Sequence, residues 1–168
     1  SFASGSDSSP GNSGYAGGLV GYYSGSGHVS DSAATGAVSG GYAAGGLVGE
    51  MYGYSNTRIQ NSRASGDVTS TGYAAGGLVG QFYDYYPAAG SGITGSSASG
   101  RVHGNNNSGG LVGYYNGYDG ITGSPATGWH FTRTPVGSSL LVGLASGTAY
   151  TFTGPLEGQS GSALRAVF

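Results

Sequence analysis

The 168-residue chain has no cysteine and no lysine, and it carries few charges of either sign. Without cysteine, neither a disulfide bond nor a thiolate metal site can form. Five basic residues, all arginine, face seven carboxylates, so no basic patch exists to hold a phosphate backbone, and we expect no binding to nucleic acid. No apolar run approaches the roughly 20 residues that a membrane-spanning helix needs, so we also expect no membrane span.

Helix signals are weak as well. Glycine and β-branched residues interrupt every window, and no apolar stripe with a 3.6-residue period persists. Glycine is the most abundant residue, with 38 copies, but it lacks the three-residue period of a collagen-like chain or a polyglycine helix bundle. The apolar segments are short, rich in Val, Ile and Tyr, and bounded by Gly, Ser and Asn, as strands are. The composition therefore predicts an all-β chain.

The dominant feature of the sequence is the segment Gly-Gly-Leu-Val-Gly, which occurs four times. The copies are Gly17–Gly21, Gly45–Gly49, Gly76–Gly80 and Gly109–Gly113, and successive leucines are 28, 31 and 33 residues apart. Each copy is followed by a β-branched residue and then by an Ala-Ser/Thr-Gly signature, which begins at Ala34, Ala64, Ala98 and Ala126. A period of this length indicates a repeat architecture, in which each unit buries its apolar face only by stacking on its neighbours.

This ordered set of landmarks resembles the GLUG motif, which is named for its Gly-Leu-x-Gly core. Such repeats are found in large bacterial surface and secreted proteins, including filamentous-haemagglutinin-like adhesins and some immunoglobulin A peptidases. The resemblance covers about residues 14–128 and implies a parallel β-solenoid with an extracellular or cell-surface location. It implies no activity, because the repeats are scaffold in the families that carry them.

We therefore expect a parallel β-helix of about four coils, right-handed as parallel crossovers are, with three strands in each repeat. Equivalent residues should stack into three buried ladders: Leu19, Leu47, Leu78 and Leu111; Val29, Ile59, Ile93 and Ile121; and Val38, Val68 and Val102. Residues 1–13 are expected to be a flexible lead or partial cap, and residues 14–129 to form the repeats. Residues 130–168 are expected to form a C-terminal β segment that either caps the coil or connects subunits, with Leu141-Val142-Gly143 as a degenerate fifth copy.

Leucine and valine are adjacent in each motif, so in one continuous strand they point to opposite faces. One of the two should then face outward, and strands that are apolar on both sides are normally covered on both sides. We expect the cover to come from the aromatic loops, the C-terminal segment or another subunit.

An aromatic cluster follows each Gly-Gly-Leu-Val-Gly, and it supplies the candidate contact surface. Its residues are Tyr22, Tyr23, Tyr52, Tyr54, Phe82, Tyr83, Tyr85, Tyr86, Tyr114, Tyr115 and Tyr118. A second column, formed by Tyr15, Tyr42 and Tyr73, precedes the motif. These rings either stack into ladders that cover the sheet, or form an adaptable binding surface of the kind built from Tyr, Gly and Ser in binding loops. The two interpretations are compatible.

Catalytic chemistry is not apparent. The carboxylates are spread one or two per repeat, and the one tempting pair, Asp84 and Asp119, fits a solvated loop face better than a glycosidase-like site. Histidines fall at different places in the repeat, which argues against a metal site. Ice binding needs regular threonine rows, whereas the column Thr35, Ser65, Ser99, Thr127 is single and mixed. We expect no enzyme activity, no cofactor and no metal.

The sequence thus predicts an extracellular, non-catalytic structural or adhesive solenoid, either a filament subunit or part of a surface adhesin. Its expected partners are further copies of itself, or a host or cell-surface glycan or protein. The alternative is a carbohydrate-recognising module, of the phage tail-fibre or passenger-domain type, that uses the tyrosine-rich loops.

Overall fold

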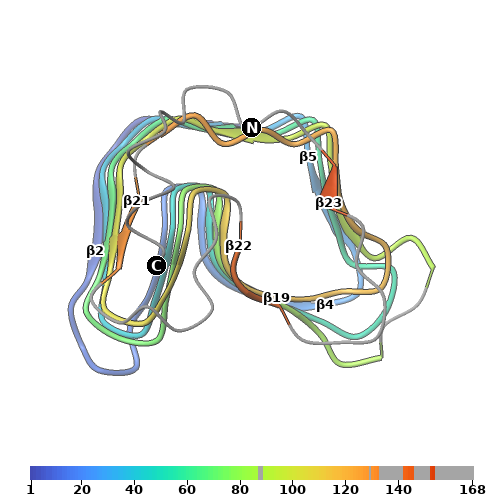
Figure 1. Ribbon diagram of the computed structural model, residues 1–168, viewed down its shortest axis with the longest axis horizontal. Coiled ribbons are helices and arrows are strands. Elements are labelled where there is room, and N and C mark those ends of the chain that lie inside the picture. Colours follow the sequence, from blue (N-terminus) through green and yellow to red (C-terminus); the bar gives the residue numbers. More distant parts are fainter. Residues whose placement is uncertain (87–88, 129, 133–141, 146–151, 154–168) are drawn as a thin grey trace.

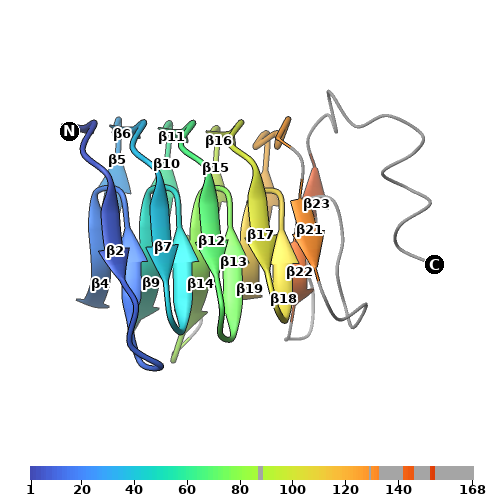
Figure 2. The ribbon, with the colours of Figure 1, turned by 90° about the vertical axis from the view of Figure 1, so that its left-hand side faces the viewer.

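Short strands separated by corners of Gly, Ser and Asn build the chain. In the computed structural model, which describes residues 1–86, 89–128, 130–132, 142–145 and 152–153, every strand pairing is parallel and no helix occurs among these residues. The chain winds round one closed outline, and equivalent strands lie directly above one another (Figures 1 and 2). The prediction of a parallel β-solenoid of about four coils is confirmed.

Five strands form each coil. The first coil contains β1 (Phe2–Ala3), β2 (Asp7–Ser9), β3 (Tyr15–Gly17), β4 (Val20–Gly25) and β5 (His28–Ser30). The second contains β6 (Ala33–Ala34), β7 (Val38–Gly40), β8 (Ala43–Gly45), β9 (Val48–Gly53) and β10 (Arg58–Gln60). The third contains β11 (Arg63–Ala64), β12 (Val68–Ser70), β13 (Ala74–Gly76), β14 (Val79–Asp84) and β15 (Gly92–Thr94). The fourth contains β16 (Ser97–Ala98), β17 (Val102–Gly104), β18 (Asn107–Gly109), β19 (Val112–Asn116) and β20 (Gly120–Thr122). Beyond these lie β21 (His130–Thr132), β22 (Val142–Ala145) and β23 (Phe152–Thr153).

Stacking of equivalent strands gives five parallel sheets, which we name in chain order. They are sheet A (β1-β6-β11-β16), sheet B (β2-β7-β12-β17-β21), sheet C (β3-β8-β13-β18), sheet D (β4-β9-β14-β19-β22) and sheet E (β5-β10-β15-β20-β23). The prediction of three strands per repeat is wrong, because two of the expected strands are each divided by a corner. Gly-Gly-Leu-Val-Gly spans the turn from sheet C to sheet D, and Ala-Ser/Thr-Gly-x-Val spans the turn from sheet A to sheet B.

The predicted ladders lie inside the coil and in register. The Leu47 N–H donates to the Leu78 carbonyl oxygen at 2.8 Å, and the Leu78 N–H donates to that of Leu111 at 2.8 Å. Ile59 pairs with Val29 on one side and with Ile93 on the other. From the second coil onward the side chains of both ladders are completely buried, whereas Leu19 and Val29 in the first coil are only partly buried.

Leucine and valine of the motif both point inward, which corrects the expectation of an outward-facing member. Leu47 and Val48 are both completely buried and belong to the same core. Their N–H groups both donate to the Leu78 carbonyl oxygen, at 2.8 and 3.1 Å, so the chain turns between sheets C and D at this point instead of running straight. The alternation of a continuous strand therefore does not apply, and the leucine-valine pair needs no external cover.

The outline in Figure 1 has a narrow lobe between sheets B and C and a wide lobe enclosed by sheets A, D and E. Each lobe has its own core. The narrow core contains only small residues, namely Ala16, Val38, Ala44, Val68, Ala75 and Val102. The wide core holds the leucine and isoleucine ladders together with the larger side chains Met51, Phe82 and Tyr115.

Glycine lets the chain fold back tightly where the two lobes meet. A Cβ atom on Gly46 would lie 2.8 Å from the Cβ of Ala64 in sheet A, and one on Gly49 would lie 2.8 Å from the Ala16 nitrogen in sheet C. Real Cβ contacts are longer than this, so only glycine allows these backbones to approach so closely. The motif therefore encodes a close approach of three sheets, with alanine as the matching small residue.

A buried serine ladder fixes the corner between sheets E and A. The Ser62 hydroxyl donates to the Gln60 carbonyl oxygen at 2.7 Å and accepts from the Ser32 N–H at 3.2 Å. Ser96 and Ser124 repeat the arrangement on the next two coils. The residues directly before these serines, Asp31, Asn61, Gly95 and Gly123, all have φ between 49° and 57°. Asn, Asp and Gly are the residues that adopt this left-handed conformation at least cost.

The N-terminal residues differ from the flexible lead or partial cap expected of them. Residues 1–13 are part of the first coil, because β1 pairs with β6 and β2 pairs with β7. Val142 pairs in register with Val112, as expected of a fifth motif copy, although Leu141 lies outside the described residues. Most of the predicted cap or connector over residues 130–168 also lies outside them.

Candidate functional site

Tyrosines gather on the outer face of sheet D and in the corner that this face makes with sheet C. Along β9 and β14 the side chains of Val48, Met51 and Phe82 enter the wide core. The residues on either side of Met51 and Phe82 therefore face out. Register gives two outward columns, which are Tyr22, Glu50, Gln81 and Tyr114, and then Ser24, Tyr52, Tyr83 and Asn116. Sheet C adds Tyr15, and Tyr42 and Tyr73 directly precede its next two strands.

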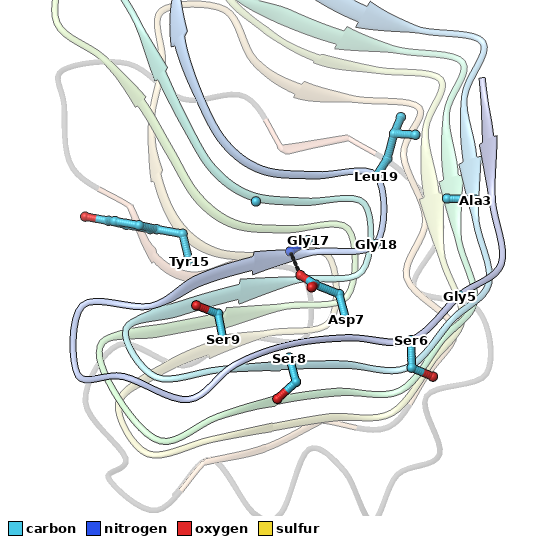
Figure 3. A pocket seen from close by; sticks show the side chains of 11 residues that line it. Ala3, Gly5, Ser6, Asp7, Ser8, Ser9, Tyr15, Gly17, Gly18 and Leu19 are labelled. Atoms are coloured by element: carbon cyan, nitrogen blue, oxygen red, sulfur yellow. Dashed lines mark hydrogen bonds between the residues drawn. The ribbon is translucent and has the colours of Figure 1, made fainter.

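Five of these residues form what we call the corner cluster: Tyr15, Tyr22, Tyr42, Glu50 and Gln81. Glu50 lies at its centre, in register with Tyr22 on the coil before and with Gln81 on the coil after. The Tyr15 ring contacts those of Tyr22 and Tyr42, with centroids 5.2 and 5.4 Å apart. Figure 3 shows Tyr15 on the side of β3 opposite to Asp7 and Ser9, outside the narrow lobe.

The electrostatics of the corner cluster are set by the burial of Glu50. Its side chain is 5% exposed, and this burial raises the pKa of the carboxyl above its ordinary 4.5, while a hydrogen bond from Tyr15 partly offsets the rise. Burial, the charge of Glu50 and the same hydrogen bond together raise the pKa of Tyr15 to about 12. The pKa of Tyr42 is also raised, first by burial and then by the charge of Glu50. Glu50 Oε2 and Gln81 Oε1 are shielded from solvent and accept no hydrogen bond in the structure.

A second group of rings occupies the far end of the sheet D face and the loops that follow it. Tyr52 and Tyr83 stack with centroids 5.2 Å apart and an interplanar angle of 15°. The loop tyrosines, by which we mean Tyr54, Tyr85, Tyr86 and Tyr118, are 45% to 63% exposed. Tyr54 and Tyr85 each contact Tyr52, so the loops rest on the stacked pair.

Residues 12–39 and 40–69 match the family model of the GLUG motif. The chain contains GLUG repeats. No curated protein and no solved structure matches it. The matched residues contain the first two copies of Gly-Gly-Leu-Val-Gly, and the structure places the third and fourth copies in register above them.

Three residues of the predicted contact surface lie instead inside the GLUG solenoid, so the prediction is wrong for them. Phe82 and Tyr115 are completely buried in the wide core, where their rings stack with centroids 5.1 Å apart. Tyr23 packs against the same core from the first coil, and its hydroxyl donates to the Ser26 carbonyl oxygen at 3.2 Å. These three occupy the Met51 column, which faces into the wide core. The other members of the set, Tyr22, Tyr52, Tyr54, Tyr83, Tyr85, Tyr86, Tyr114 and Tyr118, are exposed or partly exposed.

The two loop aspartates do not form a pair on a solvated face. Asp84 is 1% exposed, and burial raises the pKa of its carboxyl, partly offset by the Ser91 hydroxyl and the Tyr86 N–H. Asp119 is exposed, and its Oδ2 accepts a hydrogen bond from the Gly90 N–H. Within the described ranges no three His, Asp or Glu residues are grouped so as to hold a metal ion, and no helix there is long and apolar enough to cross a membrane.

A shallow pocket opens at the first coil of the GLUG solenoid, beside the narrow lobe (Figure 3). Asp7 lies in it, at the position that Val38, Val68 and Val102 occupy on the following coils. Its Oδ2 accepts a hydrogen bond from the Gly17 N–H at 3.2 Å. The narrow core therefore ends at this coil with an inward-pointing carboxylate, a device that discourages further strands from adding to an edge.

Proposed function

We propose that this GLUG solenoid is an extracellular, non-catalytic structural and adhesive element that binds its target through the loop tyrosines. The single observation that carries the proposal is their exposure on a rigid support. Tyr54, Tyr85 and Tyr118 follow the sheet D strands of three successive coils, so they lie one above another along the coil axis.

The chemistry of these loops favours binding over mere coverage of the sheet. Tyr85 and Tyr86 are at least half exposed although they contact each other edge-to-face, with centroids 4.7 Å apart. Rings left open to this extent add little to the core. They supply large amphipathic contact area at low entropic cost, and each also carries a hydroxyl that can donate or accept a hydrogen bond. A cell-surface glycan or protein is the class of target that such a surface fits.

A four-residue variant tests the proposal. Replacing Tyr54, Tyr85, Tyr86 and Tyr118 by serine should abolish binding to a glycan array and to immobilised host-matrix proteins while the far-ultraviolet circular dichroism stays unchanged. The matched control replaces an exposed column with one residue per coil by alanine, namely Thr35, Ser65, Ser99 and Thr127. Binding that survives the serine variant but not the control would place the contact on another face.

The array also separates the adhesive proposal from its alternative, a dedicated carbohydrate-recognising module. Ring stacking on sugars needs open ring faces, and the stacked pair Tyr52–Tyr83 covers one face of each ring. The loop tyrosines remain available for such contacts. Saturable binding to one family of glycans, lost in the serine variant, would favour the recognition module; binding to protein alone would exclude it.

A filament built from copies of this chain rests on a different observation. β1 to β5 are the terminal strands of their five sheets, and Leu19 and Val20 at this end are only partly buried, unlike their equivalents on later coils. Such an edge is a template for a further coil. Asp7 opposes addition on the narrow-lobe side, so the wide lobe carries the surface for stacking. Small-angle scattering that shows a monodisperse monomer across a concentration series would exclude the filament.

A further inference from the structure

The corner cluster is separate from the loop tyrosines, and coverage of a sheet does not explain it. A carboxylate normally avoids a ring-lined corner, because removal from water disfavours its charge unless a partner compensates. The Tyr15 hydroxyl favours the charged form of Glu50 and compensates part of this cost. The second oxygen, Glu50 Oε2, has no partner, and neither has Gln81 Oε1 on the adjacent coil. Both unmatched groups are acceptors, so a donor placed beside them would satisfy them.

The charge and the rings specify what kind of donor fits. An ammonium group offers three donors and a positive charge, which satisfies both acceptors and compensates the carboxylate at once. Aromatic faces nearby add cation–π attraction. Tyr15, Tyr22 and Tyr42 line the corner around Glu50.

We propose that the corner cluster binds the side-chain ammonium of a lysine on a partner protein. Glu50 is too enclosed for a rigid amino-sugar ring to reach, whereas a lysine side chain is slim and can lay its apolar stem against the tyrosine rings. Tyr22, half exposed at the edge of the cluster, is the ring that can rotate to admit it.

The sequence restricts the source of this lysine. None of the 168 residues is a lysine, so the same residues of another copy do not supply the group. The site adds to the adhesive role of the loops a separate point of attachment.

Titration of the ¹⁵N-labelled chain with Nα-acetyl-lysine methylamide tests the proposal. We expect saturable amide shifts at Glu50 and Gln81 that the norleucine analogue, which has the stem without the ammonium, does not produce. Glu50→Gln should weaken binding about tenfold or more, because it removes a charge-assisted hydrogen bond. Asp67→Asn is the matched control, since it removes one exposed carboxylate charge and should leave the affinity unchanged.

Two outcomes of this titration would overturn the proposal. No saturable shift, or equal shifts with the norleucine analogue, would mean that the two acceptors are bridged by water. Glucosamine that binds as tightly as the lysine derivative would replace the lysine by an amino sugar. Circular dichroism checks that Glu50→Gln is folded, and Gln81→Leu provides a second variant that should weaken binding severalfold. The loop-tyrosine variant should bind the lysine derivative normally, so failure of the adhesive proposal and failure of this one are distinguishable.

Discussion

Truncating a leucine of the ladder should lower the free energy of unfolding more in the middle of the ladder than at its first rung. Leu78 is completely buried between Leu47 and Leu111, and the rungs above and below it are held by backbone hydrogen bonds. The site therefore has little freedom to collapse when the side chain is removed. Leu78→Ala should lower the free energy of unfolding by about 3–5 kcal/mol, the range for leucine-to-alanine changes that leave a cavity. Leu19 is only partly buried and has a rung on one side alone, so Leu19→Ala should cost about 1–2 kcal/mol.

Urea unfolding followed by far-ultraviolet circular dichroism measures both losses in the same experiment. Because a repeat protein can unfold in parts, the slope of the free energy with urea must also be compared among the variants. A lower slope for Leu78→Ala would show that the coils on its two sides have come apart. Equal losses for the two variants, or a loss below about 1 kcal/mol at Leu78, would refute the ladder as the main support of the wide core.

Three further predictions concern the corners and the buried charge. Ser62→Ala should cost about 1–3 kcal/mol in thermal or urea unfolding, because it leaves the Ser32 N–H without a buried partner and removes one of the two hydrogen bonds to the Gln60 carbonyl oxygen; Thr69→Ala on an exposed position should cost almost nothing. Asn61→Val should cost about 1–2 kcal/mol and Asn61→Gly little, since residue 61 has φ of 49°; equal melting temperatures would contradict the corner assignment. Glu50→Gln should raise the melting temperature at pH 7. Because the folded-state pKa of Glu50 lies above 4.5, the wild type should gain stability as pH falls through that pKa toward 4.5, and the variant should gain less; a wild-type stability that falls over this interval would contradict the argument unless the variant falls further.

The ladders could be predicted because each column repeats one residue type at one place in the unit. Stacked coils put equivalent residues in register, so the spacing of Leu47 and Leu78 predicts their contact without knowledge of the corners. The corners were harder to predict. They depend on backbone conformation at small residues. When only one or two residues lie on each side of a corner, as at Leu47–Val48, the sequence pattern does not distinguish the corner from a continuous strand.

The division of the aromatic residues into buried and exposed sets depends on those same corners. Val48 and Met51 both point inward and Tyr52 points outward, whereas counting from Val48 in an unbroken strand would put Met51 outside and Tyr52 inside. Phe82 and Tyr115 follow Met51 for that reason. One signal could have separated them: this column is Tyr, Met, Phe, Tyr, a mixture that suits a core, whereas the next column contains Ser24 and Asn116.

The serine ladder and the corner cluster were missed, although both left traces in the sequence. Ser32, Ser62, Ser96 and Ser124 each lie two residues before the Ala-Ser/Thr-Gly alanine, and each follows Asp, Asn or Gly. That regularity could have been found by aligning the four units on alanine. Glu50 offered no such regularity, because its column is Tyr, Glu, Gln, Tyr, and only the structure brings it beside Tyr15.

The unequal lengths of the four units have a consequence for how such a chain diversifies. Most of the length variation lies between sheets D and E, where the connecting segments are residues 26–27, 54–57, 85–91 and 117–119. After each of them, the serine ladder returns the chain to the same register. An insertion there changes one loop and leaves its neighbours in place. The loop of each coil can thus be exchanged without changing the other coils. Duplication of a unit followed by mutation of its loop therefore yields a new surface on an unchanged scaffold. A peptide grafted between Gly53 and Arg58 would use the same independence.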